Sequence, residues 1–165
     1  MMRTAISPRF GIDWEGAAGL ADPDAGTPMT PANPVRIASN TKTYTAAAAL
    51  RLVEDGRLDL ASPIADHVPL ELTDLLAADG YDASTITVRH LLNHTSGITP
   101  EATGARNQGP WRHVLGHDGD PLTANLAFDP GTKCGYSTFG LYHASLVCET
   151  VTGKPYDQFA IEALF

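Results

Sequence analysis

Ser39 and Lys42 are a pair of residues whose types and spacing could do chemistry. They stand three positions apart at the start of a segment of good helix formers, so on a helix their side chains share one face. A serine hydroxyl is a weak nucleophile until a base accepts its proton, and an adjacent amine can fill that role. Unpaired N–H groups and the helix dipole would favour negative charge at this helix end. The pair therefore indicates a nucleophile beside its activating amine.

A purely structural interpretation of the same residues stands beside this one. A Ser-x-x-Lys spacing arises by chance about once in a chain of this length. In the structural interpretation, Ser39 or Asn40 is the N-cap of the helix and Lys42 is a solvated residue of its first turn. The motif alone leaves both interpretations open, so the rest of the sequence has to decide between them.

The composition restricts the class of protein. The 165 residues, of which 43% are hydrophobic, suffice for one domain with a packed core or for part of a larger one. The net charge of -8 argues against a nucleic acid or an anionic membrane as partner. No apolar run approaches the length of a membrane span. The N-terminus has no apolar signal core, so the chain as written is expected in the cytoplasm, or in the periplasm or outside the cell if a leader is missing.

The cysteine and histidine spacings do not predict a metal site or a cofactor. Cys134 and Cys148 have no metal-type spacing, and two free, half-buried thiols are predicted in preference to a disulfide. Two histidine pairs have members four residues apart, and no His-Glu-x-x-His pattern accompanies either. These pairs are His90 with His94 and His113 with His117.

The order of predicted elements is a hairpin followed by helices, which is an α+β arrangement. Residues 2–20 read as a β-hairpin interrupted by Gly11. Residues 35–165 read as a mainly helical region, in which residues 98–127 are loop-like apart from a short helix at 111–115. The longer helices are predicted at residues 39–55, 70–78, 88–94, 139–152 and 155–165. Because a lone hairpin is marginally stable, the other strands of its sheet are expected beyond residue 165.

Two further polar clusters lie at helix ends. Tyr136-Ser137-Thr138 stands on a loop immediately before a predicted helix, and His94-Thr95-Ser96-Gly97 ends another. Helix ends are the places where a largely helical domain can present polar groups to a shared cleft. The sequence therefore suggests that these clusters and the Ser39–Lys42 pair line one cleft.

With these segments in view, the chain resembles the serine β-lactamase and penicillin-binding-protein family. The resemblance is to the branch that contains class C β-lactamases, D-alanyl-D-alanine carboxypeptidases, D-aminopeptidases and related esterases. The handful of matching segments follows the family's order along nearly the whole chain. They are Arg36-Ile37-Ala38-Ser39-Asn40-Thr41-Lys42, Leu52-Val53-Glu54-Asp55-Gly56-Arg57-Leu58-Asp59-Leu60, Ile86-Thr87-Val88-Arg89-His90-Leu91-Leu92-Asn93-His94-Thr95-Ser96-Gly97, Pro130-Gly131, Tyr136-Ser137 and Glu149-Thr150-Val151-Thr152-Gly153.

The resemblance implies a fold and a set of roles. The fold would be β-lactamase/transpeptidase-like, and the reaction would pass through an acyl-enzyme without a metal or cofactor. Ser39 would be the acylated nucleophile, and its N–H would supply half of an oxyanion hole. Lys42 would hold or deprotonate the Ser39 hydroxyl. Tyr136 would act with the lysine as general base and then as general acid that protonates the leaving group. The substrate-binding residues would be Ser137, Thr138 and Ser96. The partner would be a small-molecule or peptide substrate.

Two departures from the family pattern keep alternatives open. Thr138 stands where this branch usually has asparagine, so it cannot offer an amide to a substrate carbonyl. The family's later Lys-Thr-Gly or His-x-Gly strand motif is absent, which makes the chain look like the truncated front half of the domain.

We therefore predict a serine hydrolase of D-Ala-type peptides, β-lactams or esters. The alternative is a catalytically incompetent homologue that serves as a binding or scaffold module. A hydrolase of another class is disfavoured, because no Gly-x-Ser-x-Gly elbow is present.

Overall fold

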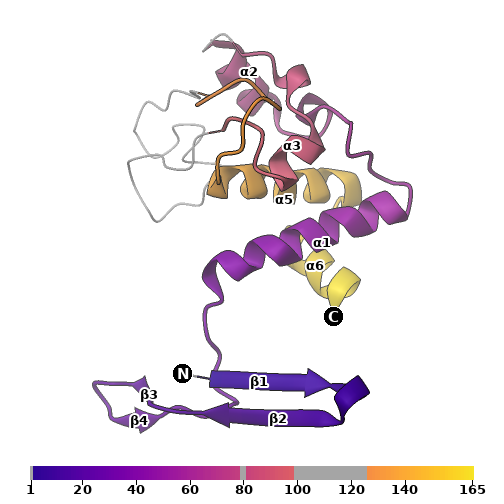
Figure 1. The fold of residues 1–165 in the computed structure, drawn as a ribbon. Helices are drawn as coiled ribbons and strands as arrows, with labels where there is room; N and C mark the ends of the chain where they lie inside the picture. The colour runs from indigo at the N-terminus through magenta and orange to yellow at the C-terminus, as the bar shows by residue number, and fades with distance from the viewer. Residues whose placement is uncertain (1, 79–80, 99–125) are drawn as a thin grey trace. The chain divides into compact units, whose positions relative to one another are not determined.

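The computed structural model of the protein describes residues 2–78, 81–98 and 126–165 (Figure 1). The chain divides into two compact units, Met1–Ala38 and Ser39–Phe165. The second unit begins at the predicted nucleophile, so every predicted site residue belongs to it. The short helix predicted at residues 111–115 and the histidine pair at 113 and 117 lie outside the described residues.

The first unit contains two small antiparallel hairpins. Strand β1 (Met2–Ser7) pairs with β2 (Ile12–Ala17), with Met2 opposite Ala17 and Ser7 opposite Ile12, which confirms the predicted hairpin. Strand β3 (Leu20–Asp22) pairs with β4 (Thr27–Pro28). The prediction of a single hairpin is therefore wrong. Strands of three and two residues that are exposed throughout have no hydrophobic alternation by which a sequence could reveal them.

The second unit is built from helices that pack around one core. Helix α1 spans Thr41–Glu54, α2 Leu70–Ala78, α3 Val88–Leu92, α5 Thr138–Thr152 and α6 Tyr156–Leu164. Helix α1 packs against both α5 and α6, and α5 also packs against α3 (Figure 1). The predicted helices are confirmed within a few residues of their ends. Helix α1 is therefore held by two other helices of this unit.

Small side chains bring α1 close to its neighbours. Ala48 and Ala49 are fully buried, and Leu52 is buried one turn further on. Alanine has no bulk beyond Cβ, so a neighbouring helix can approach α1 closely at these positions. The hydroxyl groups of Thr45 and Tyr156 share a hydrogen bond of 2.9 Å that ties α1 to α6. Apolar packing and this bond together fix the helix that carries Lys42.

The ends of α3 show how the chain reaches the second polar cluster. Thr87 caps the helix, because its hydroxyl accepts a hydrogen bond from the N–H of His90 at 3.4 Å. The helix ends at Leu92, two residues before the predicted end, and His94 adopts a left-handed backbone with φ +62°. A left-handed residue cannot continue a right-handed helix, so the chain turns away at His94.

The cysteines are both free, as predicted, but they are not alike. Cys134 is exposed and Cys148 is buried in α5. The prediction that both thiols are half-buried is therefore wrong. Burial in an apolar helix interface disfavours the thiolate and raises the pKa of Cys148 to about 12.

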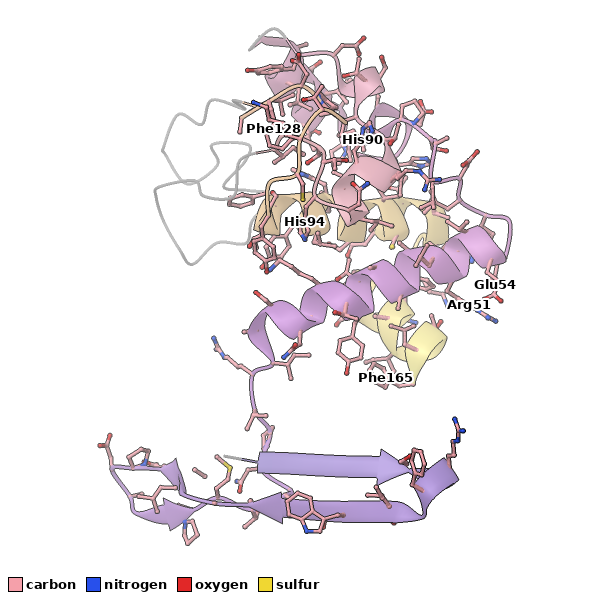
Figure 2. The ribbon with its side chains drawn as sticks, viewed as in Figure 1. Arg51, Glu54, His90, His94, Phe128 and Phe165 are labelled. Atoms are coloured by element: carbon pink, nitrogen blue, oxygen red, sulfur yellow. The ribbon has the colours of Figure 1, made fainter. Side chains whose placement is uncertain are left out.

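Gly97 makes a close main-chain contact that no other residue type can make. Its φ is +79°, and a Cβ built there would lie 2.1 Å from the carbonyl oxygen of Phe128, which Figure 2 labels. We expect Gly97→Ala to lower the free energy of unfolding by at least about 2 kcal/mol, from the left-handed backbone and from the displaced Phe128 main chain. Urea unfolding followed by circular dichroism measures the change.

Gly153→Ala is the matched control for this substitution. Gly153 has a similar φ of +69° and no atom within 4 Å of a built Cβ. Alanine at this position has the unfavourable left-handed backbone but meets no neighbouring atom. We therefore expect the free energy of unfolding to fall by less than it does for Gly97→Ala. Equal losses at the two positions would contradict the importance of the Phe128 contact.

Candidate active site

Ser39 and Lys42 meet at the entrance to α1. Ser39 lies in a 3-10 turn, Ala38–Asn40, that leads directly into the helix. The Nζ of Lys42 donates a hydrogen bond of 3.2 Å to the Oγ of Ser39. Asn40 occupies the N-cap position, but its side chain makes no capping hydrogen bond. Lys42 is half-buried. The contacts therefore disfavour the interpretation of this motif as a cap with a solvated lysine.

The backbone just before Ser39 is in an unusual conformation. Ala38 has a φ of +47°, in the left-handed region that residues other than glycine seldom adopt. Such a backbone costs on the order of 1 kcal/mol for alanine. Strain of this kind is concentrated at functional sites, where surrounding structure maintains it. The turn that presents Ser39 thus has the character of a functional element.

Tyr136 comes from the loop before α5 and joins the pair at the start of α1. The Lys42 Nζ lies 4.9 Å from the centroid of the Tyr136 ring. Hydrogen bonding to Lys42, and then to Ser39, lowers the pKa of the Tyr136 hydroxyl below its ordinary value of 10, and the lysine charge adds to the effect. A lowered pKa makes the phenolate easier to form near neutral pH. The structure therefore brings an alcohol, an amine and an acidified phenol together.

His94 is a fourth residue at this site, and it lies beside the start of α5 (Figure 2). Its ring centroid is 4.7 Å from that of Tyr136, and its Nδ1 accepts a hydrogen bond of 3.1 Å from the N–H of Ser137. Burial, and then the charge of Lys42, lowers the pKa of His94. The sequence analysis identified the polar cluster that contains His94, but it did not predict that the His94 side chain contacts Tyr136.

The three predicted substrate-binding residues have different surroundings. Ser137 is buried, and its Oγ accepts a hydrogen bond of 3.0 Å from Gly140 N–H, which makes it the N-cap of α5. Ser96 is buried, and its Oγ accepts a hydrogen bond of 3.3 Å from Ile98 N–H. Thr138 is half-buried in the first turn of α5. Substrate contact by these residues stays a prediction, and the contacts of both serines favour a structural role.

No metal-binding group is evident in the part of the chain that the structure describes. Among residues 2–78, 81–98 and 126–165, no three or more His, Cys, Asp or Glu side chains gather as a metal site would require. None of the described helices combines the length and apolar character that a membrane span needs.

Comparison with known proteins decides the family. A family model described as "Beta-lactamase" matches residues 5–165. The chain belongs to the β-lactamase family. The resemblance seen in the sequence is thereby confirmed, and so is the β-lactamase/transpeptidase-like fold with mixed helices and strands.

Three similar proteins illustrate the range of this family. The chain is 45% identical over 166 residues to the esterase EstB of Burkholderia gladioli, which covers 92% of the chain. It is 31% identical to a D-stereospecific amidohydrolase from Streptomyces sp., with a TM-score of 0.63 over 79% of the chain. A β-lactamase/D-alanine carboxypeptidase from Pseudomonas syringae has the same fold at 24% identity, with a TM-score of 0.72 over 95% of the chain. The chain spans 41% of the length of each of these β-lactamase-family proteins.

Proposed function

We propose that the protein is a serine hydrolase that forms an acyl-enzyme on Ser39. The observation that carries the proposal is the hydrogen bond of 3.2 Å from Lys42 Nζ to Ser39 Oγ, beside a tyrosine whose pKa these same two residues lower. A nucleophile within hydrogen-bond reach of an activating group is the geometry that acyl transfer requires. Membership of the β-lactamase family supports the same reaction class.

In the proposed mechanism, Tyr136 is the proton carrier and Lys42 the electrostatic support. The Lys42 Nζ lies within hydrogen-bond distance of Ser39 Oγ, at 3.2 Å, and it lowers the pKa of Tyr136, so in this mechanism the lysine orients the serine and stabilises the phenolate. The Tyr136 phenolate accepts the Ser39 proton as Oγ attacks the substrate carbonyl. The resulting tyrosine hydroxyl then protonates the leaving group when the tetrahedral intermediate collapses. Water hydrolyses the acyl-enzyme by the reverse sequence of proton transfers.

Esters are the proposed first substrate class. The relative with the higher identity, 45%, is an esterase, and the one at 31% is a D-stereospecific amidohydrolase. The side chain of Thr138 has a hydroxyl and no amide group, so it cannot bind a substrate carbonyl as an asparagine side chain would. This difference suits ester substrates that have no extended peptide backbone. D-amino acid amides and β-lactams form the second and third classes to be tested.

A panel of chromogenic substrates tests this proposal on the natural polypeptide that carries residues 1–165. We expect a burst of p-nitrophenol from p-nitrophenyl acetate, about stoichiometric with protein, because acylation of the serine releases one leaving group per site. D-alanine p-nitroanilide and nitrocefin report the other two classes. Absence of a burst and of turnover with all three would contradict the proposal and favour the catalytically incompetent binding module.

A further inference from the structure

His94 contacts three consecutive residues around the proposed proton carrier. Its main-chain carbonyl accepts a hydrogen bond of 2.8 Å from Gly135 N–H. Its ring faces Tyr136, with centroids 4.7 Å apart and planes tilted by 37°. Its Nδ1 accepts from Ser137 N–H at 3.1 Å. His94 thus contacts the Tyr136 ring directly and also binds the residues before and after Tyr136 in the chain.

The conformation of His94 is part of this arrangement. The left-handed φ of +62° lets the carbonyl and the side chain of one residue both reach the loop before α5. Residues of this conformation persist only where surrounding contacts maintain them. Adjacent residues add to the junction, since Gly131 N–H donates to the Thr95 carbonyl at 2.8 Å. The turn after α3 therefore serves as a platform for the segment that carries Tyr136.

The hydrogen bond to Ser137 also defines the protonation state of the ring. An Nδ1 that accepts an N–H carries no proton, so the neutral imidazole is protonated on Nε2. Among the described residues, the titratable or charged groups near this ring or its loop are Lys42 on α1, Tyr136 and Cys134 on the loop before α5, and His90 on α3. Protonation of Nδ1 would break the bond to Ser137 and place a second cation near Lys42.

We propose that His94 is a positioning residue, which as the neutral Nε2–H form holds Tyr136 against Lys42 and Ser39. The proposal rests on the proposed function of Tyr136. It predicts that the protein loses acylation activity as the pH falls through the pKa of His94. Burial and Lys42 place that pKa below the ordinary value of 6.5, so the loss occurs on the acid side of neutrality.

Two substitutions at His94 separate the ring from the acceptor atom. His94→Asn places a side-chain oxygen near the position of Nδ1 and tolerates a left-handed backbone, but it does not titrate. His94→Gly keeps the backbone conformation and removes both contacts. We expect His94→Gly to slow acylation of Ser39, measured as the rate constant of the p-nitrophenol burst, by about 100-fold, because a displacement of about 1 Å at a reacting group has an effect of this size. We expect His94→Asn to recover part of that rate and to lack the additional loss that accompanies His94 protonation, while it keeps the pH dependence that comes from Tyr136.

The pKa of Tyr136 is the readout that does not need activity. Ultraviolet difference titration, with Tyr136→Phe subtracted, gives this pKa directly in wild type and variants. We expect it below 10 in the wild type and raised toward 10 in His94→Gly, since Tyr136 then leaves Lys42. His90→Asn is the control: His90 lies within α3, where its Nδ1 accepts a hydrogen bond from Thr87 N–H, and its replacement should leave the pKa of Tyr136 unchanged.

The outcomes separate this proposal from the proposed function. Absence of acylation in the wild type would overturn the function, while the tyrosine titration would still report on His94. An unchanged Tyr136 pKa in His94→Gly would overturn the positioning role even if the enzyme is active. If His94→Gly fails to fold, the ¹⁵N chemical shifts of the wild-type ring decide: an unprotonated Nδ1 supports the proposal, and a protonated Nδ1 overturns it.

Discussion

Replacing Ser39 by alanine should abolish ester hydrolysis. The substitution removes the only atom that can form the acyl-enzyme in the proposed mechanism, while Lys42 and Tyr136 keep their places. Loss of the nucleophile in a serine hydrolase lowers kcat by up to roughly a million-fold, and we expect a loss of at least about 10⁴-fold here. The release of p-nitrophenol from p-nitrophenyl acetate measures both the burst and the steady-state rate.

The control for this substitution is another serine of the same unit. Ser145 lies on α5, and its hydroxyl donates a hydrogen bond of 2.7 Å to the carbonyl of Tyr142 in the same helix. Ser145→Ala should hydrolyse the ester at the wild-type rate. If Ser39→Ala retained the burst, the nucleophile would be a different residue and the proposed function would fall.

Replacing Tyr136 by phenylalanine should have the next largest effect. Phenylalanine keeps the aromatic ring that faces His94 and Lys42 and removes only the hydroxyl. A general acid–base residue contributes about 10²- to 10⁴-fold, so we expect a loss of this size in acylation rate. In the wild type the rate should rise with pH through the lowered pKa of Tyr136, because the phenolate is the base. That rise should be absent in Tyr136→Phe.

Tyr142→Phe is the control for the loss of a tyrosine hydroxyl. Tyr142 is an exposed residue of α5, and its ring lies 6.4 Å from that of Phe139, a contact that phenylalanine can keep. It should have the wild-type rate and pH profile. A Tyr136→Phe variant with unchanged acylation would show that Lys42 alone activates the serine.

The central helix could be predicted because its signals are local. A run of good helix formers begins at Ala46 and Gly56 follows the end, so the sequence predicts α1 at nearly its observed bounds. The site residues were found through family motifs, because Ser39 and Tyr136 are far apart in the sequence. The position of Tyr136 beside Lys42 depends on helix packing, which no local pattern specifies.

The features that sequence analysis missed are those without a local signal. His94 and Ser137 are 43 positions apart, so their hydrogen bond depends on the approach of α3 to α5. The role of Ser137 as an N-cap was hidden by its place in a family motif, although serine before a helix is a strong capping signal. The small β3–β4 hairpin was missed because its strands are short and exposed.

The most direct test is the mass of the protein after reaction with a fluorophosphonate, a reagent that modifies activated serines. The proposed chemistry predicts one adduct per chain, mapped by peptide sequencing to Ser39, and slower labelling when Tyr136 is phenylalanine. Labelling of a different residue, or no labelling of a folded protein that hydrolyses esters, would contradict it.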